Sequence, residues 1–533
     1  MTAKAMTAKA MTAKAMTTKG CIAAGHVETV RAAEVVLQEG GNAFDAALAA
    51  LCAACLSESV LASLGGGGFM MAKPADGKPI LYDFFAQTPV QRHGETPDFY
   101  PIHADFGATQ QEFHIGMGAA ATPGVVKGLF AIHEDLGRMP LREVVAPAVA
   151  LARKGLSVAA MQANIFPIIA PILLASPESR AVYEDADNPG KTKPEGALFR
   201  LPGYEDFLET LAIEGADLFY RGEIAQQIVA DSAARGGYLT LPDFEGYQVE
   251  RRKPLQVAHG KAHLFTNPPP SSGGMLIAFA LALAKKDFKN RTFGEPDTLL
   301  RLVRIMELTN DARRAVDFAN TPAGEAAARL LAPDMIAHYK AALDQHPKSH
   351  RGTSHISVID AQGNTASVTL SNGEGNGYFI PGTGVMLNNM LGEEDINPQG
   401  FHAWTRNIRM ASMMSPSICL RDDGEILALG SGGSNRIRTA ILQALINHLD
   451  FGLPVDLAVE SPRLHREGGQ LNIEPGFPEE SIQALRDAYP PANFWDAPSM
   501  FFGGVNMVSY HPKNGSFQGA GDSRRGGAAS VVR

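Results

Sequence analysis

Residues 351–371 read RGTSHISVIDAQGNTASVTLS, and this stretch decides the fold class. Apolar and polar residues alternate with a period of two over residues 355–360 and again over residues 365–371, which predicts two β-strands. The turn signal Gln362-Gly363-Asn364 separates the two segments. We therefore expect an antiparallel hairpin at this point of the chain.

A second hairpin and a long helix follow in the sequence. Residues 417–420 and 426–430 alternate in the same way around the turn signal Asp422-Asp423-Gly424. A helical pattern then runs from Arg438 to Leu449. Strands followed by a covering helix point to packed layers rather than to a bundle of helices.

Earlier parts of the chain are mainly helical in pattern. Residues 28–38 and 43–56 predict two helices, and Asn42 fits the N-cap of the second one. Helical patterns joined by short loops dominate from about residue 121 to residue 340. Helices in the earlier part of the chain and hairpins in the later part together predict a layered α+β structure.

Glycine clusters indicate how the chain is organised. The chain has 54 glycines in 533 residues, more than the usual share of about 7%. Adjacent glycines occur where backbone turns tightly or approaches another group closely. They are spread over the whole length, at residues 65–68, 273–274, 432–433, 503–504 and 526–527. This spread predicts one interwoven domain with a site built from distant segments.

Composition excludes several classes of protein. Apolar residues make up 45% and charged residues 19%, which is typical of a globular chain and not of a disordered one. The net charge of −9 comes without long runs of one sign, which argues against a nucleic-acid partner. Four cysteines cannot form a disulfide scaffold, and Cys52 and Cys55 fit two small buried residues of one helix better than a metal or redox pair. We expect a reduced protein without a metal or another cofactor.

Two segments bear on targeting. Residues 1–20 repeat the motif MTAKA and end in MTTKG, which we interpret as a disordered or artefactual tail. The longest apolar stretch, residues 158–175, contains two prolines and two side-chain amides, which favour a buried, broken helix over a membrane span. Because no signal peptide follows the repeat, we expect a cytoplasmic protein without a membrane partner.

Thr353 is the candidate nucleophile. It directly follows Gly352 and stands at the start of the first predicted strand. A hydroxyl needs an adjacent base, and the α-amine of Thr353 could be that base once the bond to Gly352 is cut. Such an amine titrates at about 7.7–8.0, close to the pH at which enzymes work. Taken alone, a Gly-Thr pair also fits an ordinary strand start.

Further motifs accompany Thr353 in a fixed order along the chain. They are Gly40 to Ala46, Gly65 to Phe69, Thr122 to Gly124, Gly215 to Tyr220, Pro268 to Gly274, Thr353 to Asn364, Met414 to Pro416, Gly430 to Arg436 and Asp522 to Gly527. In this order they resemble the gamma-glutamyltranspeptidase family of N-terminal-nucleophile hydrolases, from about Gly25 to the carboxyl end. Each motif is weak alone, but the shared order is highly specific. The resemblance implies a four-layer αββα sandwich with additional helices.

The resemblance also implies self-cleavage before Thr353. A large chain, residues 21–352, and a small chain, residues 353–533, would stay associated as a heterodimer within one interwoven domain. Ser371 would hydrogen-bond to the nucleophile. A three-residue hairpin loop would independently place Ser371 opposite Thr353, although a slip of one residue would turn it to the other face.

The same resemblance gives the expected oxyanion hole and substrate pocket. Backbone amides of Gly432, Gly433 and Ser434 would stabilise the developing negative charge. We also expect Asn372 to bind the substrate, and Glu393 or Glu394 to bind a substrate amine. Arg409 is a candidate replacement for the family's carboxylate-binding arginine, which this chain lacks.

Two positions depart from the family pattern. Phe85 follows Asp83-Phe84 where the family has an arginine that binds the substrate's α-carboxylate. Ser412-Met413 stands where the family has paired serines. Loss of a charged clamp on a carboxylate should cost roughly 2–5 kcal/mol of binding. The nucleophilic machinery is therefore expected to be intact, while the γ-glutamyl pocket is not.

Three functions follow as hypotheses. The first is a self-processed amidohydrolase or acyltransferase that cleaves a small amide through a threonine acyl-enzyme, with an oxamate-like acid amide as one example. The second is a true gamma-glutamyltransferase or glutathione hydrolase. The third is an unprocessed binding protein without catalytic activity.

Overall fold

Two antiparallel sheets form the centre of the molecule. The structure is a computed structural model that describes residues 18–92, 97–105, 110–285, 288, 291–317, 321–341, 353–397 and 399–533. The tail predicted over residues 1–17 and Gly352 of the predicted cleavage site lie outside these residues. Gly20, assigned to the tail in the sequence, is the first residue of strand β1 (Gly20–Ala24), so the ordered sheet begins slightly earlier than expected.

Seven strands make up the first sheet. Their order is β22 (Ala528–Val532), β1, β11 (Ser354–Asp360), β12 (Thr365–Ser371), β2 (Gly67–Lys73), β3 (Ile80–Phe84) and β8 (Glu250–Arg252). The hairpin predicted around Gln362-Gly363-Asn364 is confirmed as β11 and β12. Its register pairs Ser354 with Leu370, so the expected three-residue loop is present.

Six strands make up the second sheet, which packs face to face on the first. Their order is β21 (Ser516–Ala520), β20 (Gly504–His511), β16 (Ile426–Gly432), β15 (Ser417–Arg421), β10 (Ala262–Thr266) and β9 (Leu255–His259). The predicted second hairpin is confirmed as β15 and β16. Strands β11 and β12 contact β16 across the interface between the sheets.

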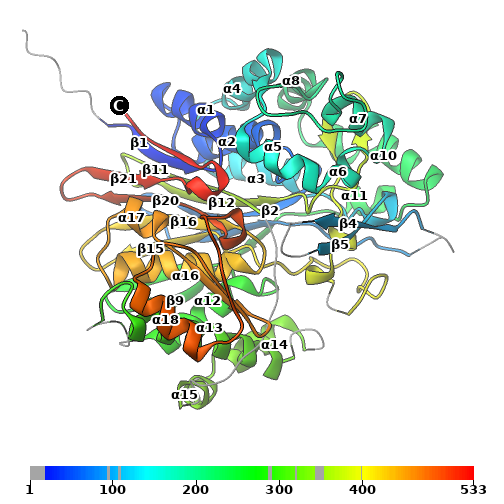
Figure 1. Cartoon of the computed structure of the whole chain (residues 1–533). Helices are drawn as coiled ribbons and strands as arrows, with labels where there is room; N and C mark the ends of the chain where they lie inside the picture. The colour runs from blue at the N-terminus through cyan, green and yellow to red at the C-terminus, as the bar shows by residue number, and fades with distance from the viewer. Residues whose placement is uncertain are drawn as a thin grey trace, which may run out of the picture.

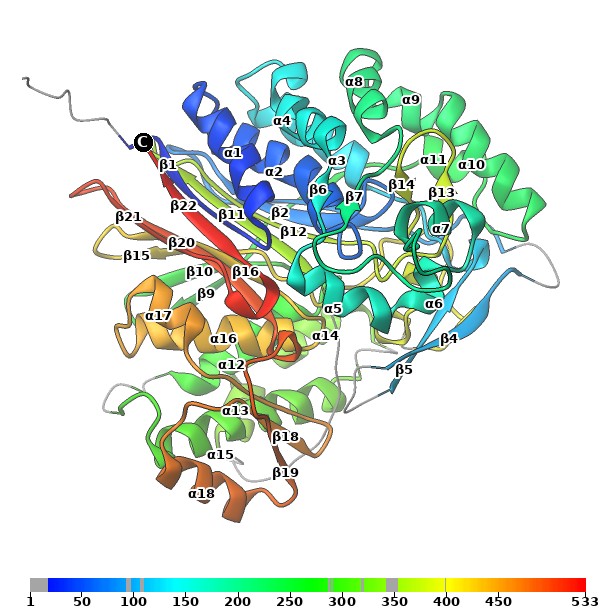
Figure 2. The same cartoon turned by 45° about the horizontal axis from the view of Figure 1, so that its top comes forward.

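Helices cover the outer face of each sheet (Figures 1 and 2). The first sheet is covered by α1 (Val27–Gln38), α2 (Ala43–Ser57) and α3 (Val125–Leu136), with α4 (Leu141–Lys154) packed outside them. The second is covered by α12 (Gly273–Ala284), α16 (Arg436–Leu449) and α17 (Val455–Glu460), with α13 (Pro296–Ala315) behind α12. The predicted αββα sandwich is therefore confirmed.

Peripheral helices extend both outer layers. Beside the first sheet they are α5 (Ala160–Ile168), α6 (Ala170–Leu173), α7 (Pro177–Tyr183), α8 (Tyr204–Glu214), α9 (Asp217–Tyr220), α10 (Glu223–Ala234) and α11 (Leu241–Glu245). Beside the second they are α14 (Ala323–Leu330), α15 (Pro333–Ala341) and α18 (Glu479–Ala488). The hairpin of β4 (Tyr100–Asp105) and β5 (Gln110–Ile115) lies at the margin of the molecule.

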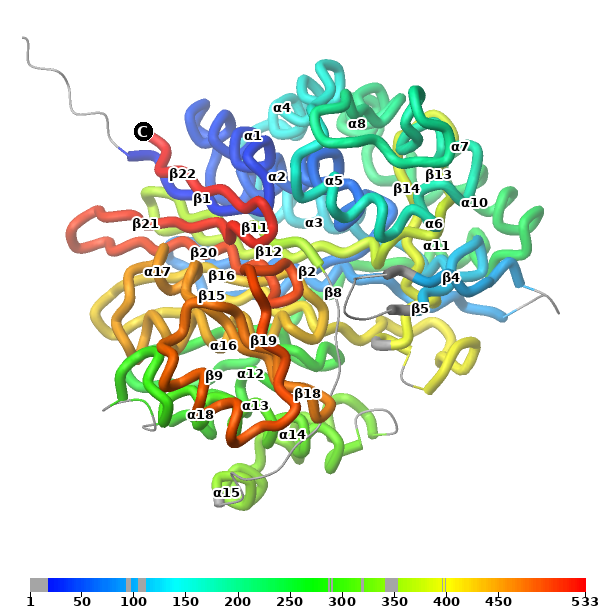
Figure 3. Tube along the Cα trace, in the orientation of Figure 1, coloured from blue at the N-terminus to red at the C-terminus, as the bar shows by residue number. Residues whose placement is uncertain are grey.

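Segments distant in the sequence meet in the first sheet. Strand β1 pairs with β11 on one side and with β22 on the other, so both ends of the described chain lie side by side (Figure 3). Strand β2 pairs with β12. The predicted small chain therefore shares a sheet with strands of the predicted large chain on both sides of its first hairpin.

Local sequence accounts for the helices that cover this sheet. The Asn42 side chain accepts hydrogen bonds from the amides of Phe44 and Asp45 at 2.8 and 2.9 Å, which confirms the predicted N-cap of α2. Cys52 and Cys55 are buried in α2, and burial raises the pKa of Cys52 to about 12, so its thiol stays protonated.

The apolar stretch at residues 158–175 forms α5 and α6, with Pro167 inside α5, as a broken helix was predicted. Among the described residues, no helix has the length and apolar character needed to cross a membrane.

Candidate active site

Thr353 lies immediately before β11, at the interface between the two sheets. Its side chain is 5% exposed and lines a cavity of about 30 Å³, which we call the inner cavity. The predicted site residues that share this cavity are Phe85, Thr353, Ser371, Glu393, Ser412, Met413 and Ser434. Its remaining lining residues are apolar: Met390, Ile396, Met414 and Ile437. The structure thus brings together residues from both predicted chains.

Ser371 ends β12 directly beside Thr353. The hairpin register that pairs Ser354 with Leu370 continues to these two residues, and both line the inner cavity. The Ser371 hydroxyl accepts a hydrogen bond from the amide of Gly373 at 3.1 Å. A Cβ at Gly66 would lie 2.4 Å from the carbonyl oxygen of Ser371, so only glycine fits under this strand end.

The turn between β16 and α16 passes directly against Thr353. A Cβ at Gly432 would lie 1.5 Å from the Thr353 carbonyl oxygen, and Gly433 has a φ of +121°. Ser434 has a φ of 45°, which non-glycine residues rarely adopt. The turn precedes the fourteen-residue helix α16, whose N-terminal end is electropositive. This arrangement fits the predicted oxyanion hole.

Two buried charged residues flank Thr353, and sequence reasoning did not single them out. Arg525 donates a hydrogen bond to the Thr353 carbonyl at 3.1 Å, and burial lowers the pKa of Arg525 to about 10. Glu58 accepts hydrogen bonds from the hydroxyls of Ser354 at 2.5 Å and Thr29 at 3.0 Å, and burial raises the pKa of Glu58. Arg525 belongs to a motif quoted above, whereas no motif marks Glu58.

Phe85 occupies the place of the expected arginine. It is 1% exposed and stacks on Phe69, with ring centroids 5.3 Å apart. Its backbone amide donates to the Asp83 carboxylate at 3.1 Å. Asp83 also pairs with Arg252 at 2.7 Å, so the carboxylate beside Phe85 is neutralised by other parts of the chain.

Arg409 does not line the inner cavity. Its guanidinium lies 3.5 Å from Asp83 and donates to the carbonyl of Phe85 at 2.6 Å and to the hydroxyl of Tyr247. The side chain is 6% exposed. Arg409 is therefore bound by Asp83, Phe85 and Tyr247 and does not line the cavity that contains Thr353.

Of the remaining predicted residues, some line the inner cavity and others do not. Glu393 lines the inner cavity, whereas Glu394 is exposed and does not line it. Asn372 is 1% exposed and packs beneath the site, where its Nδ2 lies 3.5 Å from the carbonyl oxygen of Leu387.

The inner cavity offers hydroxyls and apolar surface, with a single carboxylate. No lysine, arginine or histidine is among its described lining residues. A carboxylate on a ligand here would have no direct cationic partner, and its desolvation would be uncompensated.

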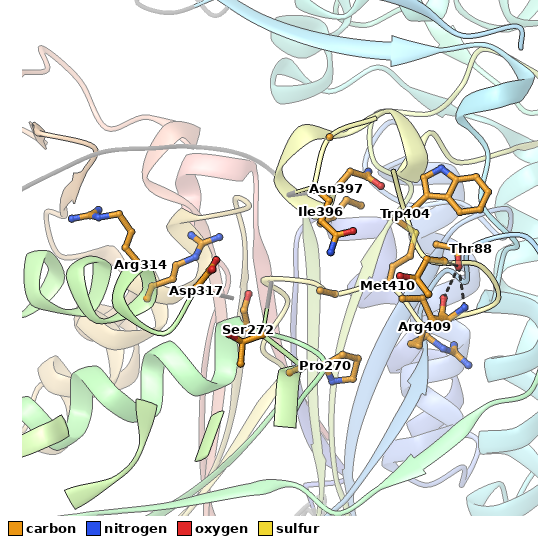
Figure 4. Close-up of a pocket in the computed structure, with 18 of the residues that line it drawn as sticks. Thr88, Pro270, Ser272, Arg314, Asp317, Ile396, Asn397, Trp404, Arg409 and Met410 are labelled. Carbon is orange, nitrogen blue, oxygen red and sulfur yellow. Dashed lines mark hydrogen bonds between the residues drawn. The ribbon is translucent and has the colours of Figure 1, made fainter. Parts of the chain in front are cut away.

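A second, larger cavity adjoins the inner one. It has a volume of about 530 Å³, and we call it the outer cavity (Figure 4). Pro270 and Ser272, from the proline-serine-glycine motif at residues 268–274, form part of its wall. Ile396 is the one described residue that lines both cavities.

Comparisons with known proteins agree with these features. The Acylase ACY 1 proenzyme of Pseudomonas sp. (strain SE83) is 29% identical over 535 residues, covering 96% of this chain and 93% of the relative. The Glutathione hydrolase proenzyme of Escherichia coli (strain K12) is 29% identical, covering 95% and 90%. The structure of cephalosporin acylase from Bacillus halodurans matches with a TM-score of 0.82 at 22% identity, covering 97% and 96%, which supports the fold.

A family model described as Gamma-glutamyltranspeptidase matches residues 29–532, nearly the whole chain. The resemblance drawn from the order of the motifs is thereby confirmed. The chain is an enzyme of the gamma-glutamyltranspeptidase family of N-terminal-nucleophile amidohydrolases.

Proposed function

We propose that this chain is a self-processed threonine amidohydrolase that cleaves amides with a short acyl group. The observation that carries the proposal is the inner cavity, where Thr353, Ser371 and the Gly432 turn meet. The name proenzyme, given to both relatives described above, supports processing in this chain as well.

Processing starts with the hydroxyl of Thr353. Its oxygen attacks the carbonyl carbon of Gly352, the peptide C–N bond breaks, and the acyl group moves from nitrogen to oxygen. The break of the C–N bond frees the α-amine of Thr353, and water then hydrolyses the ester to give the free Thr353 hydroxyl and a carboxylate on Gly352. The chains 21–352 and 353–533 stay together in this proposal, because β11 pairs with β1 and β12 pairs with β2.

Catalysis repeats the same chemistry on an amide substrate. The freed amine takes the proton of the Thr353 hydroxyl, whose oxygen bonds to the substrate's acyl carbon. The amide C–N bond breaks, the leaving amine receives that proton, and water or another amine then releases the acyl group from Thr353. Backbone amides of the turn at Gly433 and Ser434 stabilise the oxyanion in both steps.

The size and charge of the inner cavity limit the acyl group. About 30 Å³ holds roughly two or three water-sized groups. Phe85 contributes shape but no charge at the position where a γ-glutamyl carboxylate would be bound. An oxamate-type carboxylate also lacks a cation among the described lining residues. We therefore propose that the inner cavity preferentially accepts short uncharged acyl groups.

The second candidate is glutathione hydrolysis or γ-glutamyl transfer. Glu393 lines the inner cavity, and its carboxylate suits the ammonium group of a γ-glutamyl substrate. The 29% identity to the Escherichia coli glutathione hydrolase proenzyme adds weight to this candidate.

Mass spectrometry and an amide panel test the proposal together. The purified protein should contain a fragment that begins at Thr353, and an intact chain would favour an unprocessed binding protein instead. Acetyl and propionyl amides should be hydrolysed faster than glutathione and γ-glutamyl-p-nitroanilide. Preference for the γ-glutamyl substrates would establish the second candidate in place of the first.

A further inference from the structure

The two cavities differ in size and share one lining residue among those that the structure describes. The inner cavity has about 30 Å³ and the outer cavity about 530 Å³. Ile396, in the short helix η3 (Glu394–Ile396), lines both. Of these two cavities, Thr353 lines the inner one and not the outer one, so the scissile carbonyl must lie on the inner side of Ile396.

The two cavities also differ in how exposed their lining residues are. Most side chains of the inner cavity are buried, including Phe85 at 1% and Met414 at 2%. The outer cavity includes exposed residues, with Ile408 at 45% and the Arg314 side chain at 51%. Solvent therefore reaches the outer cavity more easily than the inner one.

The outer cavity has an apolar wall. Trp404, Met410, Pro270 and Ile408 contribute to it, and Trp404 is only 6% exposed, with its ring beneath the Arg92 guanidinium at 4.7 Å. Surfaces of this kind bind ring systems.

Its charges are balanced within the protein. Each arginine of the outer cavity lies within ion-pair distance of a carboxylate: Arg313 with Glu467 at 3.7 Å, Arg314 with Asp311, and Arg409 with Asp83 at 3.5 Å. A strongly anionic ligand is therefore not the best match.

One polar group in the outer cavity stands out. Asn397 is 5% exposed, and its Nδ2 donates to the carbonyls of Met390 and Glu393 at 2.8 and 2.7 Å. Its Oδ1 is buried and has no hydrogen-bond partner among the described residues. A ligand N–H or O–H group would satisfy this acceptor.

We infer that the outer cavity binds the amine half of the substrate, a bulky and largely apolar ring-bearing amine with a hydrogen-bond donor for Asn397, and that Ile396 limits the length of the acyl half. The inference rests on the proposed function. The leaving amine departs before the acyl group does, so it belongs in the cavity that opens to solvent. The acyl group stays bonded to Thr353 until it is released, so it belongs in the enclosed cavity.

Three variants test the assignment on amides of paired sizes. The substrates are the acetyl and pentanoyl amides of aniline and of 2-naphthylamine, because the two amines differ in size more than in basicity. Ala323→Trp adds bulk to the outer cavity from the start of α14 (Ala323–Leu330). Glu325→Trp, on the exposed face of the same helix, is the matched control. Ile396→Ala should widen the connection between the two cavities, and Ile396→Val should do so to a smaller extent.

Processed protein with Ala323→Trp should lose about tenfold or more in kcat/KM for the naphthylamides and less than about twofold for the anilides. The Glu325→Trp control should change neither value. Ile396→Ala should raise the pentanoyl-to-acetyl ratio of kcat/KM by about tenfold. If that variant fails to fold, Ile396→Val should raise the same ratio.

The outcomes separate the inference from the proposed function. An equal effect of Ala323→Trp on both amines, or an unchanged acyl preference in both Ile396 variants, would overturn the inference while amide hydrolysis persists. If the processed wild type releases amine from none of these amides or from the acetyl and propionyl panel, the proposed function fails and this inference fails with it.

Discussion

The guanidinium of Arg525 donates a hydrogen bond to the main-chain carbonyl of Thr353 over 3.1 Å. A second hydrogen bond, to the carbonyl of Met500 at 3.2 Å, fixes the other end of the guanidinium. The same group lies against the glycine turn, because a Cβ at Gly432 would be 3.1 Å from its Nη1. Arg525 therefore links the nucleophile to the predicted oxyanion hole from within the small chain.

Replacing Arg525 should impair turnover more than substrate binding. Once the bond before Thr353 is cut, Arg525 would be one of the groups that hold the new chain end in place. We expect Arg525→Met to lower kcat by about 100-fold at nearly constant KM, because misplacement of a reacting group by about 1 Å costs that much. Arg525→Lys should recover part of the loss. Steady-state kinetics on processed protein measures both values.

Arg524 provides the matched control for this prediction. It is also buried, but it pairs with Glu474 at 2.6 Å and Asp522 at 3.2 Å and makes no contact with Thr353 that the structure describes. Arg524→Lys should lower the melting temperature and leave kcat nearly unchanged. Equal kcat in Arg525→Met and the wild type would show that Arg525 has no positioning role.

Thr353 substitutions should distinguish the role of the hydroxyl from that of the surrounding residues. Thr353→Ala removes the attacking oxygen, so we expect one uncut and inactive polypeptide. Thr353→Ser keeps the oxygen and should cleave, more slowly, with part of the activity retained. A denaturing gel and mass spectrometry of the fragment that begins at residue 353 give the answer. Full activity of Thr353→Ala would remove the nucleophile assignment.

Phe85→Arg should restore affinity for γ-glutamyl compounds. The substitution places a cation beside the inner cavity, at the position where the family has its carboxylate-binding arginine. A charged partner for a carboxylate is worth roughly 2–5 kcal/mol, so KM for γ-glutamyl-p-nitroanilide should fall at least about tenfold. Phe85→Met, which is similarly long but uncharged, should leave KM unchanged. An equal fall in both variants would mean that space, and not charge, limits binding.

Much of the fold could be predicted because local patterns and tertiary packing agree. The hairpin of β11 and β12 alternates cleanly, since its two faces pack against different layers, and its turn sets the register. Strands β9 and β10 were missed in a region expected to be mainly helical. They are short, and two of the five residues of β9 are exposed, so the strands lack a strong apolar pattern.

The candidate site was predictable only where a motif marks it. Thr353 and the turn at Gly432 lie in motifs, and the hairpin register places Ser371 beside Thr353 at the inner cavity. Glu58 and Ile396 carry no such mark, because burial and a shared cavity wall are properties of the folded chain. Arg409 illustrates the converse, since only the structure reveals that Asp83 and Tyr247 bind its side chain.

His355 should make stability depend on pH. The ring is buried between the sheets, with its nitrogens 2.8 Å from the hydroxyl of Thr369 and 2.9 Å from that of Ser357. Burial lowers the pKa of His355 to about 3, against about 6.5 in an unfolded chain. The unfolded state therefore binds this proton more readily than the folded state does. The resulting stability is fully present above pH 6.5 and is lost as the pH falls toward 3.

At pH 5 this single group should cost about 2 kcal/mol of unfolding free energy relative to pH 8. The measurement is urea unfolding at pH 8 and pH 5 in the Thr353→Ala background, which keeps one polypeptide and avoids chain dissociation. His355→Gln retains a hydrogen-bonding side chain but cannot titrate, so it should be less stable at pH 8 yet lose about 2 kcal/mol less between the two pH values. His263→Gln, at a site where the side chain is 48% exposed, should leave the pH dependence unchanged. Parallel pH dependence of the parent and His355→Gln would show that another group, such as buried His465, causes the acid sensitivity.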